Sequence, residues 1–168
     1  MLGDVNGWNE PVSYRPIGVI HTPHTDPKQT PIQPRYAEGI EGQIEIDLAF
    51  EQGLDDLDGF SHIVLLFHFH RARPYRLRVV PFIDNVLRGV FSTRAPSRPN
   101  PIGMSVVRLV RRDGSMLYVS DVDMLDGTPL LDIKPHIARF GIEGPTRNGW
   151  QDAIDEDTAT RLGRRLAG

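Results

Sequence analysis

The chain has 168 residues, of which 39% are hydrophobic and 24% charged, and its formal net charge is −3. This length fits one domain of ordinary size, because a chain this long can bury about 70% of its unfolded surface. The absence of cysteine excludes disulfides and thiolate metal sites, and residues 1–11 lack a secretion signal while no apolar run approaches a membrane span. We therefore expect a cytoplasmic protein that makes no membrane contact.

The first half of the chain carries three strand-like segments and one long loop. Residues 14–20 form a short apolar run, residues 43–46 alternate in polarity, and residues 62–70 are an unbroken β-branched and aromatic run. Four prolines between residues 21 and 36 predict an irregular loop. A loop of that length in a compact domain is usually functional or mobile.

The second half continues the strand pattern. The dipeptide Asp-Gly at 113–114 separates strand-like residues 105–110 from 116–122 and predicts a hairpin, because a primed turn needs the positive φ that glycine adopts. A second Asp-Gly, at 126–127, marks a turn before the apolar residues 130–133.

Helical signals are few. Residues 48–57 fit one or two turns, and residues 152–166 predict a short C-terminal helix because three apolar residues share one stripe, namely Ile154, Leu162 and Leu166. Several short strands joined by Pro- and Gly-rich connections predict a mainly β fold, a barrel or a sandwich rather than a doubly wound sheet.

Arginine is concentrated between residues 71 and 112. This segment holds ten arginines and a single acid, Asp84, and 17 of the 19 basic residues in the whole chain are arginine. A G+C-rich genome would explain the choice of arginine over lysine, but it would not explain the clustering. Because arginine pairs bidentately with phosphate and stacks on bases, the cluster favours contact with nucleic acid. It also fits binding of nucleotides or anionic metabolites, and a solvated basic face.

Residues 89–105, GVFSTRAPSRPNPIGMS, are the most informative segment. Its three prolines fix their own φ and keep the preceding residues extended, so the loop has little conformational freedom. A stiff loop can hold Arg94, Arg98 and Asn100 at fixed positions. Two rigidly placed guanidinium groups suit a phosphate, a carboxylate or a nucleotide.

Three histidines support a rival hypothesis. His62, His68 and His70 have the same parity on one expected strand, and the His-Phe-His spacing is used in barrel metal sites. A metal-dependent barrel enzyme could use this face. Val64 and Leu66 share it, however, and such histidines more often line a core or a pocket, so we expect no metal.

Familiar nucleotide-binding and hydrolase motifs are missing. The sequence has no G-x-G-x-x-G after a strand, no phosphate-binding G-x-x-x-x-G-K and no G-x-S-x-G elbow. A nucleotide-like cofactor would therefore be bound without a glycine loop at a helix terminus.

Three motifs together resemble the TsaA-like (YaeB-like) family: IGVIHTPH at 17–24, GVFSTRAPSRPNPIGMS at 89–105 and DVDMLDGTPLLDIKPHI at 121–137. The segment GFSHIVLLFHFH, residues 59–70, is similar to the central strand of that family. Characterised members are S-adenosylmethionine-dependent methyltransferases that act on the exocyclic amine of threonylcarbamoyl-adenosine, next to the anticodon of tRNA. The resemblance implies a single-sheet β-barrel with long loops over residues 12–140, usually homodimeric, followed by a C-terminal extension with a short helix over residues 141–168.

Carried over position by position, the resemblance also implies a cofactor pocket. Its residues come from the early loop, the end of the central strand, the stiff loop and the DGTP turn: Gln33, Pro34, His70, Arg71, Arg94, Met104, Leu125, Asp126, Gly127, Thr128 and Pro129. Arg94 is expected to pair with the methionine carboxylate of the cofactor. Contact with tRNA phosphate is expected from four other arginines, namely Arg73, Arg76, Arg78 and Arg98.

The catalytic residues stay open at the level of sequence. Methyl transfer from a sulfonium depends mainly on in-line alignment, with a proton acceptor needed late. The polar candidates in the two motifs are Asn100, Asp132, Lys134 and His136, each of which could equally be structural, and many relatives have tyrosine where this chain has His136.

Two questions about the substrate also stay open. Some bacterial relatives continue with another domain, so we expect this chain to be a short form. Such a form either binds tRNA through its arginines and a dimer mate, or acts on another substrate. A non-catalytic module that binds S-adenosylmethionine is the remaining alternative.

Overall fold

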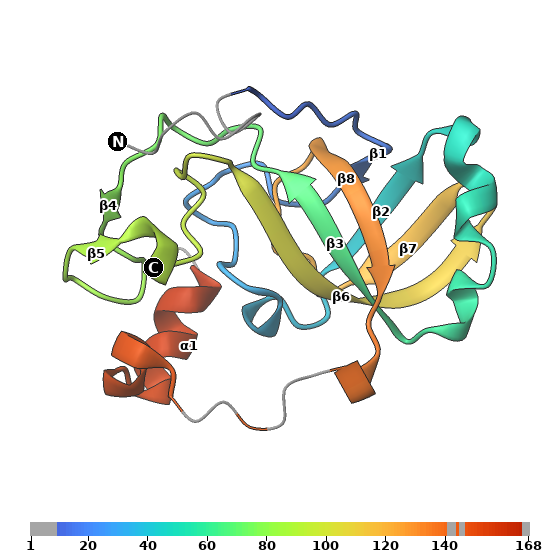
Figure 1. The fold of residues 1–168 in the computed structure, drawn as a ribbon. Helices are drawn as coiled ribbons and strands as arrows, with labels where there is room; N and C mark the ends of the chain where they lie inside the picture. Colours follow the sequence, from blue (N-terminus) through green and yellow to red (C-terminus); the bar gives the residue numbers. More distant parts are fainter. Residues whose placement is uncertain (1–9, 141–143, 145–146, 166–168) are drawn as a thin grey trace.

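The computed structural model describes residues 10–140, 144 and 147–165. Six antiparallel strands close into a barrel in the order β1-β2-β7-β6-β3-β8 (Figure 1). They are β1 (Gly18–His21), β2 (Glu41–Ile46), β3 (His62–His68), β6 (Ile102–Asp113), β7 (Met116–Ser120) and β8 (Thr128–Pro135). A separate two-stranded sheet joins β4 (Arg78–Val79) to β5 (Arg88–Gly89) beside the barrel. The mainly β, single-sheet barrel predicted from the sequence is confirmed.

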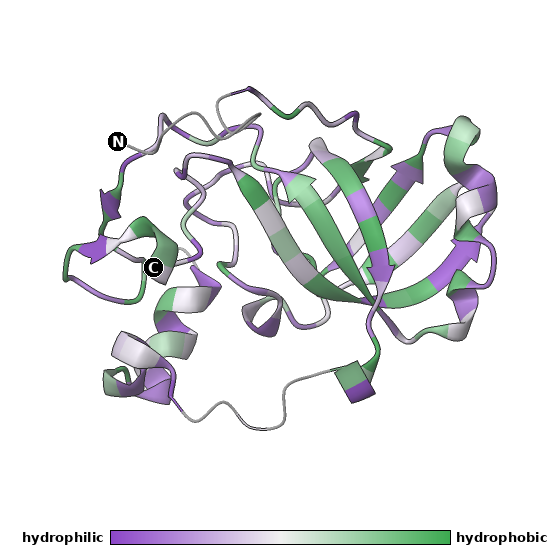
Figure 2. Ribbon diagram, viewed as in Figure 1, coloured by the Kyte–Doolittle hydropathy of each residue, from purple (hydrophilic) through white to green (hydrophobic). Residues whose placement is uncertain are grey.

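Alternation along the strands builds the core. In β2, the residues Gly42, Ile44 and Ile46 are buried, whereas the three residues that alternate with them are exposed. Figure 2 shows the same change of polarity from residue to residue on several strands. In β3, Ile63, Leu65 and Phe67 point inward. Because side chains of successive strand residues point to opposite faces, one set of apolar residues fills the barrel and leaves the polar set outside.

Two predicted turns are present. Gly114, with φ of 60°, and Ser115 form the two-residue loop of the β6–β7 hairpin. Gly127, with φ of 72°, lies in the turn that precedes β8. Glycine adopts this left-handed backbone without steric penalty, so both Asp-Gly signals predicted the local geometry correctly.

Two strand boundaries differ from the prediction. The strand expected over 62–70 ends at His68, because the backbone N–H of His70 turns back to donate to the His68 carbonyl at 2.8 Å. β6 begins at Ile102, earlier than expected, and its Gly103 faces the ring of Phe67. A Cβ at position 103 would lie 2.2 Å from Phe67 Cε2, so only glycine lets the ring pack there.

Most helical segments are single 3₁₀ turns. The turn expected after β2 is η2 (Leu48–Leu54), and others are η1 (Pro34–Tyr36), η3 (Leu57–Gly59), η4 (Val90–Ser92), η5 (Ala138–Phe140) and η6 (Gly149–Ala153). The one α-helix of the described ranges is α1 (Glu156–Arg164), which Asp155 caps by accepting from the Thr158 N–H at 2.8 Å. Leu166 of the predicted stripe lies outside the described residues.

Helix α1 packs on the early loop rather than on the barrel wall. The Ile32 N–H donates to the Gly163 carbonyl at 3.0 Å, and Arg35 pairs with Glu156 at 2.6 Å. Gly163 lies against the Tyr36 ring, where a Cβ would come within 2.5 Å of Cδ2. Within the described ranges, no helix is long and apolar enough to cross a membrane.

Candidate functional site

A cavity of about 930 Å³ lies at one end of the barrel. Its floor is made where β3 ends, near Phe67, and where β6 begins, at Gly103–Ser105. Its walls come from the early loop, the stiff loop, residues 79–83, the turn before β8 and the C-terminal extension. This volume is in the range of sites that enclose a nucleotide-sized ligand.

Most of the residues expected to contact a cofactor line this one cavity. They converge from four separate segments and are Gln33, His70, Arg71, Arg94, Met104, Leu125 and Thr128. Asn100 and Arg98 lie in the same lining. Four others flank it without lining it, namely Pro34, Asp126, Gly127 and Pro129.

Arg94 joins the two loops that face each other across the cavity. Its guanidinium donates to Gln33 Oε1 at 2.6 Å, and Gln33 Nε2 donates to the Ile32 carbonyl at 2.6 Å. A guanidinium carries five N–H donors in a planar fork, so the bond to Gln33 orients Arg94 and still leaves donors for an anionic ligand.

The stiff loop is held by hydrogen bonds as well as by its prolines. Arg98 donates from its guanidinium to the Thr93 carbonyl at 3.2 Å, and the Phe69 N–H donates to the Pro101 carbonyl at 2.8 Å. The Ile102 N–H donates to the Asn100 carbonyl at 2.7 Å. The bond from Phe69 connects the loop to the residue that follows β3, and the other two bonds restrain residues 93–102 internally.

The turn before β8 is tied to the exit of β1. Asp126 Oδ1 accepts from the Thr22 N–H at 3.1 Å, and the Gly127 N–H donates to the Ile20 carbonyl at 3.0 Å. Thr128 Oγ1 donates to the Leu125 carbonyl at 2.7 Å. Asp126 and Gly127 thus hold the turn that carries Leu125 and Thr128 to the cavity.

The environment of His70 favours the neutral form of its imidazole. Burial lowers the pKa of its imidazole, and the nearby Arg71 and His68 lower it further, while Asp126 opposes them. Thr128 Oγ1 lies 3.4 Å from His70 Nδ1. A neutral imidazole at this place can both donate and accept a hydrogen bond.

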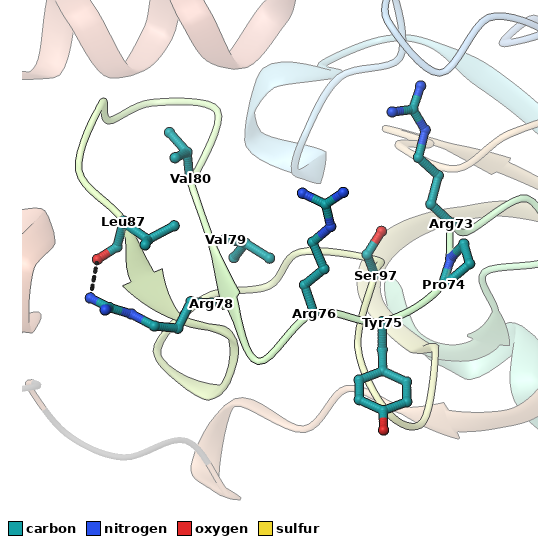
Figure 3. Close-up of a pocket in the computed structure, with 9 residues that line it drawn as sticks. All are labelled: Arg73, Pro74, Tyr75, Arg76, Arg78, Val79, Val80, Leu87 and Ser97. Carbon is teal, nitrogen blue, oxygen red and sulfur yellow. Dashed lines mark hydrogen bonds between the residues drawn. The ribbon is translucent and has the colours of Figure 1, made fainter.

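Three of the arginines expected to contact tRNA line a second hollow of about 500 Å³ (Figure 3). Arg73 and Arg76 extend to the same side in this view, whereas Tyr75 extends to the opposite side. Arg78 donates to the Leu87 carbonyl at 3.3 Å. Arg98 lines the larger cavity instead, and the two hollows adjoin because both are lined by Val79, Val80 and Ser97.

Three polar candidates for catalysis lie outside the cavity lining. Asp132 and Lys134 pair with each other at 2.7 Å on β8, and the His136 N–H donates to the His62 carbonyl at 3.1 Å. β8 begins at the cavity with Thr128 and runs away from it to Pro135, so His136, which follows the far end of the strand, lies roughly 25 Å from Thr128.

The histidine arrangement does not gather three ligands. No group of three or more His, Cys, Asp or Glu side chains in the described part of the chain could hold a metal ion. His62 and His68 do share one face of β3, but they lie six residue positions, or about 20 Å, apart along the strand, and His70 lies beyond its end. Equal parity in the sequence puts side chains on one face of a strand, but it does not bring them close enough together to bind one metal ion.

Several residues of the cavity were not predicted from the sequence. Trp150, Gln151 and Arg165 reach the cavity from the C-terminal extension. Arg165 donates to the Pro27 carbonyl and lies 3.5 Å above the centre of the Phe82 ring, and burial lowers its pKa. Asp123, three residues before the DGTP turn, also lines the cavity, and its position in that motif was the available signal.

Comparison with known proteins agrees with this geometry. Residues 19–141 match the family described as the tRNA-methyltransferase O N-terminal domain. A probable S-adenosyl-L-methionine-binding protein of Pyrococcus abyssi is 54% identical over 139 residues, which cover 83% of this chain and 76% of that protein. The tRNA (adenine(37)-N6)-methyltransferase of Mus musculus is 39% identical over 132 residues, which cover 74% of this chain and 31% of that enzyme.

A solved structure shares the fold. The crystal structure of TrmO from P. aeruginosa superposes with a TM-score of 0.71 at 39% identity, covering 86% of this chain and 63% of that one. The chain thus spans less than two thirds of this solved protein and about a third of the mouse enzyme.

Proposed function

Because the chain belongs to the tRNA-methyltransferase O N-terminal domain family, the TsaA-like family, we propose that it is an S-adenosylmethionine-dependent methyltransferase acting on tRNA. Its substrate in this proposal is the exocyclic amine of threonylcarbamoyl-adenosine next to the anticodon. The observation that carries the proposal is the cavity of about 930 Å³ on which the stiff loop, the early loop and the turn before β8 converge.

The residues of the cavity suit this cofactor. Arg94, fixed by Gln33, offers a fork of N–H donors to the methionine carboxylate. Leu125 and Thr128 lie in the wall on a turn that hydrogen bonds hold in place, where they could contact the adenine. When bound, the cofactor supplies an activated methyl group, and the chain contributes alignment of that group with the accepting nitrogen.

Calorimetry with S-adenosylmethionine, followed by mass spectrometry of tRNA nucleosides after incubation with the protein, tests the proposal. We expect saturable binding and the appearance of methylated threonylcarbamoyl-adenosine. Absence of binding at millimolar ligand would rule out the cofactor. Binding without methylation of any tRNA would instead favour a module that only binds S-adenosylmethionine.

The arginines of the second hollow are proposed to bind tRNA phosphate. Changing Arg73, Arg76 and Arg78 together to alanine should weaken tRNA binding and leave S-adenosylmethionine binding intact. Each lost phosphate contact makes the negative slope of log affinity against log salt shallower by about 0.7–0.9, so the loss of three contacts makes it shallower by roughly 2–3. Filter binding over a salt series measures both quantities.

Arg15→Ala is the matched control for this triple variant. Arg15 is an exposed arginine that pairs with Asp47 at 3.3 Å, and it lies in neither hollow. It should leave the salt slope unchanged. An equal slope for the triple variant and the wild type would exclude these arginines from the tRNA surface.

A homodimer is also part of the proposal. Apolar side chains outside both hollows are exposed along and beside the β4–β5 sheet: Leu77, Val86 and Phe91. Clustered exposed apolar groups of this kind are typical of protein interfaces. Sedimentation equilibrium should give twice the chain mass, and a monomer at high concentration would contradict it.

A further inference from the structure

Asp123 is a carboxyl held in place in the cavity wall. It lies in the segment that joins β7 to β8, between the buried side chains of Val122 and Met124. Ser105, on β6, donates from Oγ to Asp123 Oδ1 at 2.6 Å, and both residues line the cavity. The buried neighbours fix the backbone and the serine fixes the rotation of the carboxyl group.

The surroundings of Asp123 are otherwise cationic or neutral. Asp123 is the single carboxyl within the described lining. The same lining contains one imidazole and four guanidinium groups, which belong to His70, Arg71, Arg94, Arg98 and Arg165. β6 presents the Ser105 hydroxyl to it, and the stiff loop presents Arg94, whose charge acts on it. Among the described lining residues, Asp123 is therefore the one whose carboxylate could accept a proton from a ligand.

We infer that Asp123 is the catalytic proton acceptor of the methyl transfer. This inference rests on the proposed function. The amine nitrogen forms a bond to the methyl carbon, and the bond from that carbon to sulfur breaks with its electron pair going to sulfur, which becomes a neutral thioether. The N–H proton passes to a carboxylate oxygen of Asp123, and the electron pair of that N–H bond stays on nitrogen. The carboxylic acid then releases the proton to water.

The titration of Asp123 fits this role. Burial raises the pKa of its carboxyl to about 7, although the Ser105 hydrogen bond and the charge of Arg94 lower it. A proton acceptor works best when its pKa is near the working pH. Because the carboxylate is the active form, the transfer rate should fall as the pH drops below about 7 and level off above it.

Asp123→Asn tests the inference by separating binding from chemistry. Asparagine keeps the shape and an oxygen that can accept from Ser105, but it cannot take a proton. We expect the single-turnover rate of methyl transfer at saturating S-adenosylmethionine to fall about 10²–10⁴-fold. The Kd for the cofactor should change by less than about threefold, which is less than about 0.7 kcal/mol of binding free energy. The acid limb of the pH profile should disappear.

Ser105→Ala provides a second measurement on a protein that retains the carboxyl. It removes a hydrogen bond that stabilises the carboxylate, so the pKa of Asp123 rises and the acid limb should move to higher pH. A purely structural Asp123 would not transmit this change to the pH profile.

The outcomes are separable. If the wild type transfers no methyl group to tRNA, the proposed function fails and the inference falls with it. If the wild type is active and Asp123→Asn retains its single-turnover rate, only the inference fails. A weakened Kd with an unchanged rate at saturation would make Asp123 a partner for the cofactor's ammonium group and would overturn its role as proton acceptor.

Discussion

Arg94→Ala is expected to weaken binding of S-adenosylmethionine about ten- to a hundredfold. A hydrogen bond between charged groups contributes about 1.5–3 kcal/mol, and the variant removes the only fork proposed for the methionine carboxylate. It also releases Gln33, whose Oε1 accepts from Arg94 at 2.6 Å and so connects the early loop to the stiff loop. Isothermal titration calorimetry measures the change in Kd directly.

Two further variants make this result specific. Arg94→Lys keeps the charge but loses the planar fork, so its Kd should lie between those of the wild type and the alanine variant. Arg15→Ala removes an exposed arginine that pairs with Asp47, and it should bind as the wild type does. Equal affinities for Arg94→Ala and Arg15→Ala would remove Arg94 from the cofactor site.

Gly103→Ala is expected to lower the free energy of unfolding by about 1–3 kcal/mol. The added Cβ would lie 2.2 Å from Cε2 and 2.4 Å from Cζ of Phe67, a core side chain that is 2% exposed. Phe67 cannot move away freely, because its ring packs edge-on against Phe69 with centroids 5.3 Å apart. For a chain of this length the melting temperature should fall roughly 3–10 °C.

Gly53→Ala is the control for this prediction. A Cβ at Gly53 would meet nothing within 4 Å, so its melting temperature should stay near that of the wild type. Phe67→Leu shortens the opposing side chain. It should lower the free energy of unfolding less in the Gly103→Ala background than in the wild type, and a double-mutant cycle measures this difference. Additive effects would show that the two side chains do not collide.

The strands could be predicted because their signal is local. Alternation in β2, the apolar run of β3 and the Asp-Gly pair before β7 all depend on residues adjacent in sequence. The strand order could not be predicted, because β6 pairs with both β3 and β7 through contacts between distant residues. The early start of β6 was missed for a related reason: it depends on the Phe67 ring that Gly103 accommodates.

The candidate site divides in the same way. Arg94 and its stiff loop stood out in the sequence, because proline restricts the backbone wherever it occurs. Asp123 did not, since its environment arises only when β6 brings Ser105 against it. The histidine hypothesis failed on distance, because parity identifies the face of a strand but says nothing about separation along it.

Arg165 and Trp150 make the tail of the chain part of the cavity wall. Trp150 Nε1 donates to the Ser92 carbonyl at 2.9 Å, while Arg165 reaches the Pro27 carbonyl and the Phe82 ring. If residues 147–165 can detach from this wall, a ligand that contacts only the attached form stabilises the attachment, and the attachment strengthens binding by the same free energy. The affinity for the cofactor and the resistance of residues 147–165 to proteolysis would then both depend on the equilibrium between attached and detached forms of this segment.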